Sequence, residues 1–215
     1  MNEDEFQIAR KHMVEDQIAA RGVLNPRLLA VMESVPRHLF VPADDLPWAY
    51  VDGPLLIGHE QTISQPYIVA LMTELLQVES TDRVLEVGTG SGYQAAVLGQ
   101  IAAEVHTLEV IPELATQAAR TLIDLGYFNV HVHAGDGSLG WLEATPYDGI
   151  LVAAAAPSAP QPLLDQLAEG GHLVIPVGSR GLQQLEVWRR TGKKFERQVS
   201  LAVCFVPLRG EYGWK

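Results

Sequence analysis

The chain has 215 residues, of which 47% are hydrophobic and 19% are charged, and 15 basic against 26 acidic side chains give a net charge of −11. A chain of this length buries one full core and hardly two, so we expect a single domain over residues 1–215. The acidic balance, with lysines and arginines scattered, disfavours a nucleic-acid partner because a polyanion would be repelled.

Two further classes are disfavoured by the sequence. No apolar run approaches the roughly 20 residues that a membrane-spanning helix needs, so we expect a soluble, cytoplasmic protein without a membrane partner. The single cysteine, Cys204, excludes a disulfide framework and a thiolate metal cluster. Because it stands among Val203, Phe205 and Val206, it is predicted to be a buried core residue.

The first eighty residues are predicted to form short helices and loops. Phe6, Ala9 and Met13 share a helical face, and Asn25 before Pro26 predicts the start of a helix that reaches about Met32. Prolines and glycines punctuate an irregular segment from 36 to 66, whose apolar content argues for a functional loop. The next helix is indicated by apolar residues on one face: Ile68, Val69, Met72, Leu75 and Leu76.

Alternating strands and helices follow, which is the pattern of a doubly wound α/β sheet. Helices are expected between the consecutive strands, which are predicted at 83–88, 104–110, 130–134, 148–154 and 171–177. Leu182–Arg190 and Phe195–Leu208, joined by Thr191–Lys193, predict an antiparallel hairpin at the sheet edge. The prediction is therefore a mostly parallel sheet with a C-terminal hairpin, in which a core over 81–215 follows a helical and loop extension over 1–80.

The run Val84–Gly92 (VLEVGTGSG) is typical of a buried strand that turns through glycines into a helix. Gly88, Gly90 and Gly92 permit a tight turn and let a ligand approach the bare backbone. Tyr93 stands where a dinucleotide fingerprint has its third glycine, so NAD is the weaker interpretation.

Acidic residues follow two neighbouring strands at the same sheet edge. Glu109 ends the second strand, where an acid commonly meets ribose hydroxyls, and Asp136 lies between Gly135 and Gly137 after the third. The sequence contains no GxxxxGK[ST] run that would cradle a chain of phosphates. The pattern therefore favours S-adenosylmethionine over ATP.

Four stretches of sequence are informative: Pro36–Pro42 (PRHLFVP), Ile57–Pro66 (IGHEQTISQP), Val84–Gly92 and Gly170–Gly178 (GGHLVIPVG). On these segments the chain resembles the protein-L-isoaspartate O-methyltransferases over nearly its whole length. The resemblance implies a Rossmann-like methyltransferase that moves a methyl group from S-adenosylmethionine to the free carboxylate of L-isoaspartyl residues in damaged proteins and peptides. The transfer would leave S-adenosylhomocysteine as its other product, and the methyl ester would then lead to repair through a succinimide.

The same resemblance implies roles for particular residues. Ser64 would be catalytic and would bind substrate together with Gln65, Val206 and Pro207. The cofactor contacts would be Gln61, Thr62, Ile63, Gly88, Thr89, Gly90, Glu109, Asp136 and Gly137. The chain departs from the family pattern at Ala153, where a threonine is usual, and at Glu60, where a glycine is usual.

The chemistry expected of Ser64 is limited. A carboxylate with an ordinary pKa near 4 is already ionised at pH 7, so no general base is needed, and a hydroxyl could orient it by a hydrogen bond. A serine two residues before Pro66 is also a plausible helix cap, which is the structural alternative. The segment 40–65 could act as a lid over the cofactor.

Other functions stay open at this point. A methyltransferase for a small molecule and a non-catalytic protein that senses S-adenosylmethionine are the two alternatives. His131 and His133 share one face of a strand but lack a third ligand, so no metal is expected. His59 is expected to lie at the surface or to line the substrate site. A monomer is expected.

Overall fold

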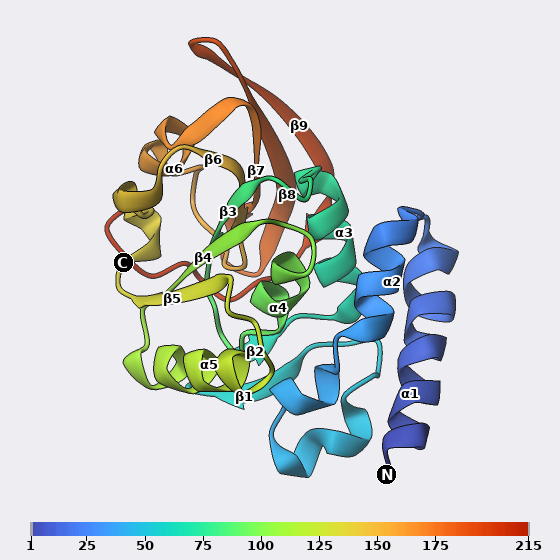
Figure 1. Cartoon of the computed structure of the whole chain (residues 1–215). Coiled ribbons are helices and arrows are strands. Elements are labelled where there is room, and N and C mark those ends of the chain that lie inside the picture. The colour runs from blue at the N-terminus through green and yellow to red at the C-terminus, as the bar shows by residue number, and fades with distance from the viewer. Residues whose placement is uncertain (1, 215) are drawn as a thin grey trace.

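A seven-stranded sheet forms the centre of the computed structural model, which describes residues 2–214 (Figure 1). The strand order is β5-β4-β3-β6-β7-β8-β9, parallel from β5 through β7 and antiparallel at β7–β8 and β8–β9. The strands are β3 Arg83–Val87, β4 Glu104–Glu109, β5 Val130–Ala134, β6 Tyr147–Val152, β7 Leu167–Ser179, β8 Leu182–Thr191 and β9 Lys194–Val203. The predicted doubly wound sheet with its C-terminal hairpin is confirmed.

Helices precede the sheet and connect its strands. Figure 1 shows α1 and α2 side by side near the N-terminus, while α5 and α6 lie against the sheet far from them. The α-helices described are α1 Glu3–His12, α2 Pro26–Ser34, α3 Pro66–Leu76, α4 Tyr93–Gly99, α5 Pro112–Asp124 and α6 Gln161–Asp165. None of the helices within residues 2–214 has both the length and the apolar character needed to span a bilayer.

The N-terminal helices form as the sequence predicts. Phe6 and Met13 are buried on one face of the first helical segment, with Ala9 partly covered between them. The Asn25 side chain accepts hydrogen bonds from the backbone amides of Arg27 and Leu28, which fixes the start of α2. Helix α1 continues through a π-helical turn, Met13–Ile18, and a short 3₁₀ turn, Ala19–Arg21.

Apolar side chains are buried on both faces of the sheet. Alternate residues of a strand point to opposite faces, so Val84 packs with α3 and α4 while Leu85 packs with α6. Because both faces are covered, β3 and β6 are mostly apolar, whereas β4 and β5 also carry polar side chains such as His106 and His133. The strand order reverses between β3 and β6, and ligands of such sheets bind beside that reversal.

The connection from β5 to β6 corrects one prediction. A helix is expected there, but the chain forms only two 3₁₀ turns, Gly137–Leu139 and Leu142–Ala144. The connection runs only from 135 to 146 and holds glycines at 135, 137 and 140, which leaves little room for a stable helix.

The end of the last strand corrects a second prediction. Strand β9 ends at Val203 rather than Leu208, and Cys204 is exposed rather than buried. Beyond β9 the chain crosses to the end of β6, where Ala155 N donates to Val206 O at 2.8 Å and Leu208 N donates to Ala155 O at 2.7 Å. This crossing turns Cys204 toward a groove at the surface.

The predicted irregular segment from 36 to 66 contains regular structure. Strands β1 Leu55–Gly58 and β2 Gln61–Ile63 pair antiparallel as a small hairpin. Its turn places His59 and Glu60 in the left-handed region, with φ of 51° and 60°. For residues other than glycine that conformation costs roughly 1–2 kcal/mol each. The substitution of glutamate for the family's usual glycine therefore falls at a position where glycine is the unstrained choice.

Candidate active site at the strand ends

A cleft lies at the carboxyl ends of β3, β4 and β6, and we call it the inner cleft. It contains about 860 Å³ of space free of protein atoms, part of it open to solvent. Most of the predicted cofactor residues line it: Gln61, Thr62, Ile63, Gly88, Thr89, Gly90, Glu109 and Gly137. Ser64, Val206 and Pro207 line it as well.

The glycine turn after β3 brings bare backbone to the floor of this cleft. Gly88 and Gly90 have φ of +96° and +52°, which side-chain-bearing residues rarely adopt. The amide of Gly88 donates to Leu108 O at 2.8 Å and so ties the turn to β4. A Cβ added to Gly90 would lie 3.3 Å from Ile57 of the β1–β2 hairpin. The hairpin therefore packs directly over the turn.

Glu109 is held in place at the end of β4. Its Oε2 accepts a hydrogen bond from the Gly90 amide at 2.9 Å, and its Oε1 accepts one from the Ile111 amide at 3.0 Å. Each carboxylate oxygen keeps a further lone pair, and the residue is only 6% exposed. A fixed carboxylate in this position can accept hydrogen bonds from a pair of ribose hydroxyls.

The third strand end contributes Gly137 to the cleft lining. A Cβ on Gly137 would stand 2.5 Å from Val87, so only glycine fits. Asp136 does not line the cleft. Its carboxylate accepts hydrogen bonds from the amide and hydroxyl of Ser138 at 2.9 and 2.6 Å and from the Glu211 amide at 2.8 Å. Its role toward a cofactor stays a prediction, since here it fastens the C-terminal segment.

A second hollow, the outer groove, adjoins the inner cleft between α3 and the C-terminal crossing. Its lining is Arg21, Pro54, Thr62, Ser64, Gln65, Tyr67, Ile68, Ala153, Leu201, Ala202, Val203, Cys204, Phe205 and Val206. The two hollows share Thr62, Ser64, Ala153 and Val206. These residues form the boundary across which a group could pass from one hollow to the other.

Ser64 stands at that boundary with its hydroxyl free of hydrogen bonds to residues 2–214. The N-cap of α3 is Gln65, without a side-chain hydrogen bond to the helix, so the interpretation of Ser64 as a cap is wrong. Instead, Pro66 at the first helical position starts the helix, since its missing amide needs no partner. The Ser64 hydroxyl is therefore available to a ligand.

A buried acid lies behind the glycine turn. Glu86 in β3 has no exposed surface, and its Oε1 has no hydrogen-bond partner among the described residues. Thr107 donates to its Oε2, and Thr107 in turn is 2.6 Å from the hydroxyl of Thr89 in the turn. Burial raises the pKa of the Glu86 carboxyl to about 8; the bond from Thr107 lowers that pKa and the charge of Glu109 raises it.

This buried acid predicts how stability depends on pH. Because the folded state holds a proton that the unfolded state releases above its ordinary pKa of 4.5, stability falls as pH rises from there to about 8. Glu86→Gln, which is neutral at every pH, should flatten the decline in urea midpoint between pH 5 and pH 9. Glu196→Gln, at an exposed position, is the control and should show the same decline in urea midpoint as the wild type. An undiminished decline in Glu86→Gln would show that Glu86 is ionised in the native state.

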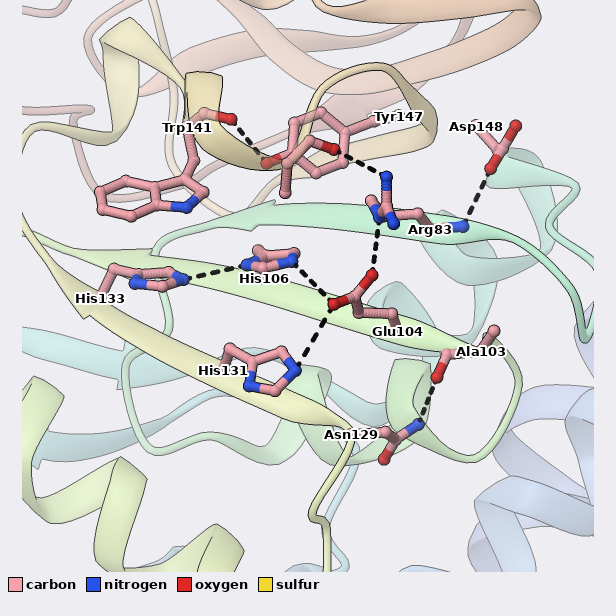
Figure 2. A network of polar contacts seen from close by, with 11 residues as sticks. Arg83, Ala103, Glu104, His106, Asn129, His131, His133, Trp141, Tyr147 and Asp148 are labelled. Atoms are coloured by element: carbon pink, nitrogen blue, oxygen red, sulfur yellow. Dashed lines mark hydrogen bonds and ion pairs between the residues drawn. The ribbon is translucent and has the colours of Figure 1, made fainter.

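Three histidines from β4 and β5 cluster on the face of the sheet opposite Glu86 (Figure 2), and none of the three lines either hollow. Nδ1 of His106 and Nε2 of His133 are hydrogen-bonded at 3.0 Å, and the His133 ring stacks on Trp141 with centroids 4.0 Å apart. Glu104 lies 3.4 Å from His106 and 3.7 Å from His131. No group of three or more potential ligands within residues 2–214 is placed to hold a metal ion.

The cluster predicts sensitivity to acid. Burial lowers the pKa of His106 and of His133, and neighbouring histidines lower both further, whereas Glu104 opposes the shift at His106 and Glu143 at His133. Below the ordinary histidine pKa of 6.5 the unfolded state binds more protons, so stability falls as pH drops.

His106→Phe keeps a ring between His133 and Tyr147 but cannot be protonated. We expect it to lose less urea stability than wild type between pH 7 and pH 5. His12→Gln, at an exposed position in α1, should behave as wild type does. Equal acid losses in all three proteins would mean that His106 is not what titrates.

Sequence reasoning missed several residues of the two hollows. Val110 and Ile111 line the inner cleft. They could have been predicted from the sequence, because they are an apolar pair directly after the acidic residue Glu109 at a strand end. Tyr93 also lines the cleft and is almost fully buried. Arg21 and Tyr67 meet in the outer groove from distant parts of the chain, with no pattern in the sequence to indicate it.

Comparison with known proteins gives a consistent result. Residues 8–213 match the family model of protein-L-isoaspartate(D-aspartate) O-methyltransferase. Proteins named protein-L-isoaspartate O-methyltransferase from Picosynechococcus sp. and Methanoregula boonei are 57% and 54% identical, each over 206 residues. The alignments cover 95% of this chain and 92% of the first relative, and 96% of this chain and 95% of the second.

Solved structures agree with these relatives. A protein-L-isoaspartate O-methyltransferase superposes with a TM-score of 0.82 at 28% identity, covering 99% of this chain and 67% of that chain. A Plasmodium falciparum structure assigned as the β-aspartate methyltransferase PCMT, in complex with S-adenosyl-L-homocysteine, has a TM-score of 0.81 at 25% identity. That alignment covers 93% of this chain and 98% of the other.

Proposed function

The chain belongs to the protein-L-isoaspartate(D-aspartate) O-methyltransferase family, and we propose that its methyl transfer takes place where the inner cleft opens into the outer groove. The enzyme uses S-adenosylmethionine to methylate the free carboxylate of L-isoaspartyl residues in proteins and peptides. One observation supports this location above others: the half-buried Ser64, whose hydroxyl is free, lines both hollows.

The inner cleft suits S-adenosylmethionine by the chemistry of its lining. Glu109 offers a carboxylate fixed by two amides, and the glycine turn offers backbone without side chains. Among its lining residues Arg209 is the single cation, which fits a nucleoside better than a chain of phosphates. We assign the cofactor contacts to the cleft-lining Gln61, Thr62, Ile63, Gly88, Thr89, Gly90, Glu109 and Gly137. Asp136, which follows β5 and does not line the cleft, stays a further predicted contact. When bound, S-adenosylmethionine supplies a methyl group on a positively charged sulfur.

The chain's contribution to catalysis is mainly alignment. An isoaspartyl carboxylate reaches the site ionised, so Ser64 has only to hold it by one hydrogen bond. A hydroxyl orients the carboxylate without neutralising it, whereas a guanidinium would blunt its attack. Holding two reactants at near-attack distance supplies about 7–11 kcal/mol. The β1–β2 hairpin covers the cleft and limits the access of water.

The peptide on either side of the isoaspartyl residue would lie in the outer groove. The C-terminal crossing forms one wall, with Val206 at the boundary and Pro207 exposed beside it. Because Val206 O and Leu208 N are bonded to Ala155, this wall is fixed and can receive an extended peptide. After transfer, the neighbouring amide nitrogen attacks the ester carbonyl carbon and expels the methoxy group as methanol. This closes a succinimide without help from the protein, whereas an unmethylated carboxylate has no comparable leaving group.

Labelled methyl transfer tests the function directly. The assay compares one peptide with isoaspartate against its twin with ordinary aspartate, using S-adenosylmethionine with a radiolabelled methyl group. We expect label on the isoaspartyl peptide alone. Faster labelling of a free metabolite would favour a small-molecule methyltransferase, and tight cofactor binding without labelling would favour a sensor. The comparisons favour neither alternative.

We further propose that the chain acts as a monomer and as one domain, in the cytoplasm, on protein substrates and not on nucleic acid. Support for one domain comes from a shared core: Phe6 and Met13 of the extension belong to the same apolar cluster as Val84 and Val105 of the sheet. Light scattering at micromolar concentration should give the mass of one chain. A mass of two chains would reject the monomer.

A further inference from the structure

Three segments that are distant in sequence meet beside Ser64. They are the 3₁₀ turn that ends at Arg21, the loop that holds Asp52, and Gln65 at the start of α3. Among the described residues that line the outer groove, Arg21 is the only one with a charged side chain. The junction is made of charged and polar side chains, so apolar packing around the two hollows does not account for it.

Asp52 is the centre of the junction. The Arg21 guanidinium donates to Asp52 Oδ2, and Nε2 of Gln65 donates to Asp52 Oδ1 at 2.7 Å, with a longer contact of 3.5 Å to the Asp52 carbonyl. The guanidinium also lies over the ring of Tyr67, 4.9 Å from its centroid. Each oxygen of the carboxylate therefore holds a different segment.

The shape of the N-terminal helix brings Arg21 to this position. The π-helical turn Met13–Ile18 widens the helix, and Gln17 on it donates to Tyr50 O at 2.9 Å. The helix then ends at Gly22, whose φ is +92°. Gln17 and Arg21 thus attach one helical segment to the loop over 50–52 at two points.

The junction contributes little to overall stability. The side chains of Arg21 and Asp52 are 42% and 24% exposed, and partly exposed ion pairs contribute about 0–1 kcal/mol. What the junction does is tie the Gln65 side chain to the loop at Asp52. The hydroxyl of Ser64, the preceding residue, has no hydrogen bond within residues 2–214, so the placement of Ser64 depends on its neighbour.

On the basis of the proposed role of Ser64, we propose that Arg21, Asp52 and Gln65 are positioning residues that set the Ser64 hydroxyl against the acceptor carboxylate. Gln65 then acts through Asp52 and not by binding the peptide itself. The Arg21 guanidinium stays paired with Asp52 and therefore does not bind the acceptor carboxylate. A guanidinium bound there would weaken the attack of that carboxylate on the methyl group. Displacement of a reacting group by about 1 Å can cost on the order of 100-fold in rate.

Reversing the polarity of one hydrogen bond tests this. Gln65→Glu sets a carboxylate against that of Asp52, and we expect kcat for an isoaspartyl peptide to fall about 10-fold or more. Gln65→Glu combined with Asp52→Asn restores a donor and an acceptor, and kcat should return to within about 3-fold of Asp52→Asn alone. The Kd for S-adenosylmethionine and the melting temperature should stay near the wild-type values in every variant.

A double-mutant cycle separates positioning from general structure. Arg21→Met should lower kcat in the wild-type background but change it less than about 2-fold in the Ser64→Ala background. Arg21→Lys should recover part of the loss. Arg120→Met is the matched control, because it removes the same charge from the exposed pair with Asp124. It should leave kcat unchanged.

The outcomes distinguish this inference from the function on which it rests. A wild-type enzyme that methylates the peptide, with full activity in Gln65→Glu and Arg21→Met, overturns the inference alone. The inference is also overturned if Arg21→Met lowers kcat by the same factor in the Ser64→Ala background as in the wild-type background. The network would then act independently of Ser64. A wild-type protein that does not label the isoaspartyl peptide overturns the proposed function.

Discussion

Replacing Ser64 by alanine should lower kcat for an isoaspartyl peptide by about 10- to 100-fold, because a hydrogen bond to a charged group contributes about 1.5–3 kcal/mol. The loss should appear in turnover and not in cofactor binding, since Ser64 lines both hollows and its hydroxyl has no other partner within the described chain. Steady-state kinetics and calorimetric titration with S-adenosylmethionine measure the two effects separately.

Two companion variants make the Ser64 result specific. Ser64→Thr keeps a hydroxyl and should retain more activity than Ser64→Ala. Ser200→Ala removes a hydroxyl from an exposed position on β9 and should match wild type. Equal losses of turnover and of cofactor affinity in Ser64→Ala would instead mean that the residue shapes the inner cleft.

Replacing Glu109 by alanine should have the opposite signature. Its carboxylate is the acceptor expected for ribose hydroxyls and also orients the amides of Gly90 and Ile111. Loss of one hydrogen bond to a charged group costs about 1.5–3 kcal/mol of binding free energy, so the Kd for S-adenosylmethionine should rise at least about 10-fold. At saturating cofactor, kcat should change little.

The matched control for Glu109 is Glu113→Ala, which removes the same charge from the exposed first turn of α5. Glu109→Gln keeps an acceptor oxygen and should fall between wild type and Glu109→Ala. An unchanged Kd in Glu109→Ala would move the ribose away from the end of β4. A fall in kcat with an unchanged Kd would give Glu109 a role in alignment instead.

The strands and the inner cleft were predictable because their physical requirements are local. A parallel strand covered on both faces is mostly apolar, as Val84, Leu85 and Val87 are, and its turn onto a ligand needs residues such as Gly88 and Gly90. Glu109 could be found because strand ends of a parallel sheet converge on one edge. Each of these features is signalled by the few residues around it, although Glu109 lies 19 residues beyond Gly90.

The outer groove was harder to predict because distant segments build it. No period in the sequence places Arg21 beside Asp52 or turns Cys204 toward solvent; those positions follow from the π-helical turn and the crossing after β9. The orientation of Asp136 is equally hard to predict, since its carboxylate accepts hydrogen bonds from Ser138 nearby and from the distant Glu211. Tertiary contacts of this kind, between residues far apart in the chain, cannot be predicted from the local sequence.

The boundary between the two hollows also has a consequence for inhibitor design. Because only Thr62, Ser64, Ala153 and Val206 line both compartments, the partition is about one side chain thick. A bisubstrate compound that joins an S-adenosyl group to a peptide carboxylate mimic should therefore need a linker of about one or two atoms, near the roughly 3 Å separation of reacting atoms in a near-attack geometry. Longer linkers would have to buckle within the passage and would lose the gain in effective concentration that tethering gives.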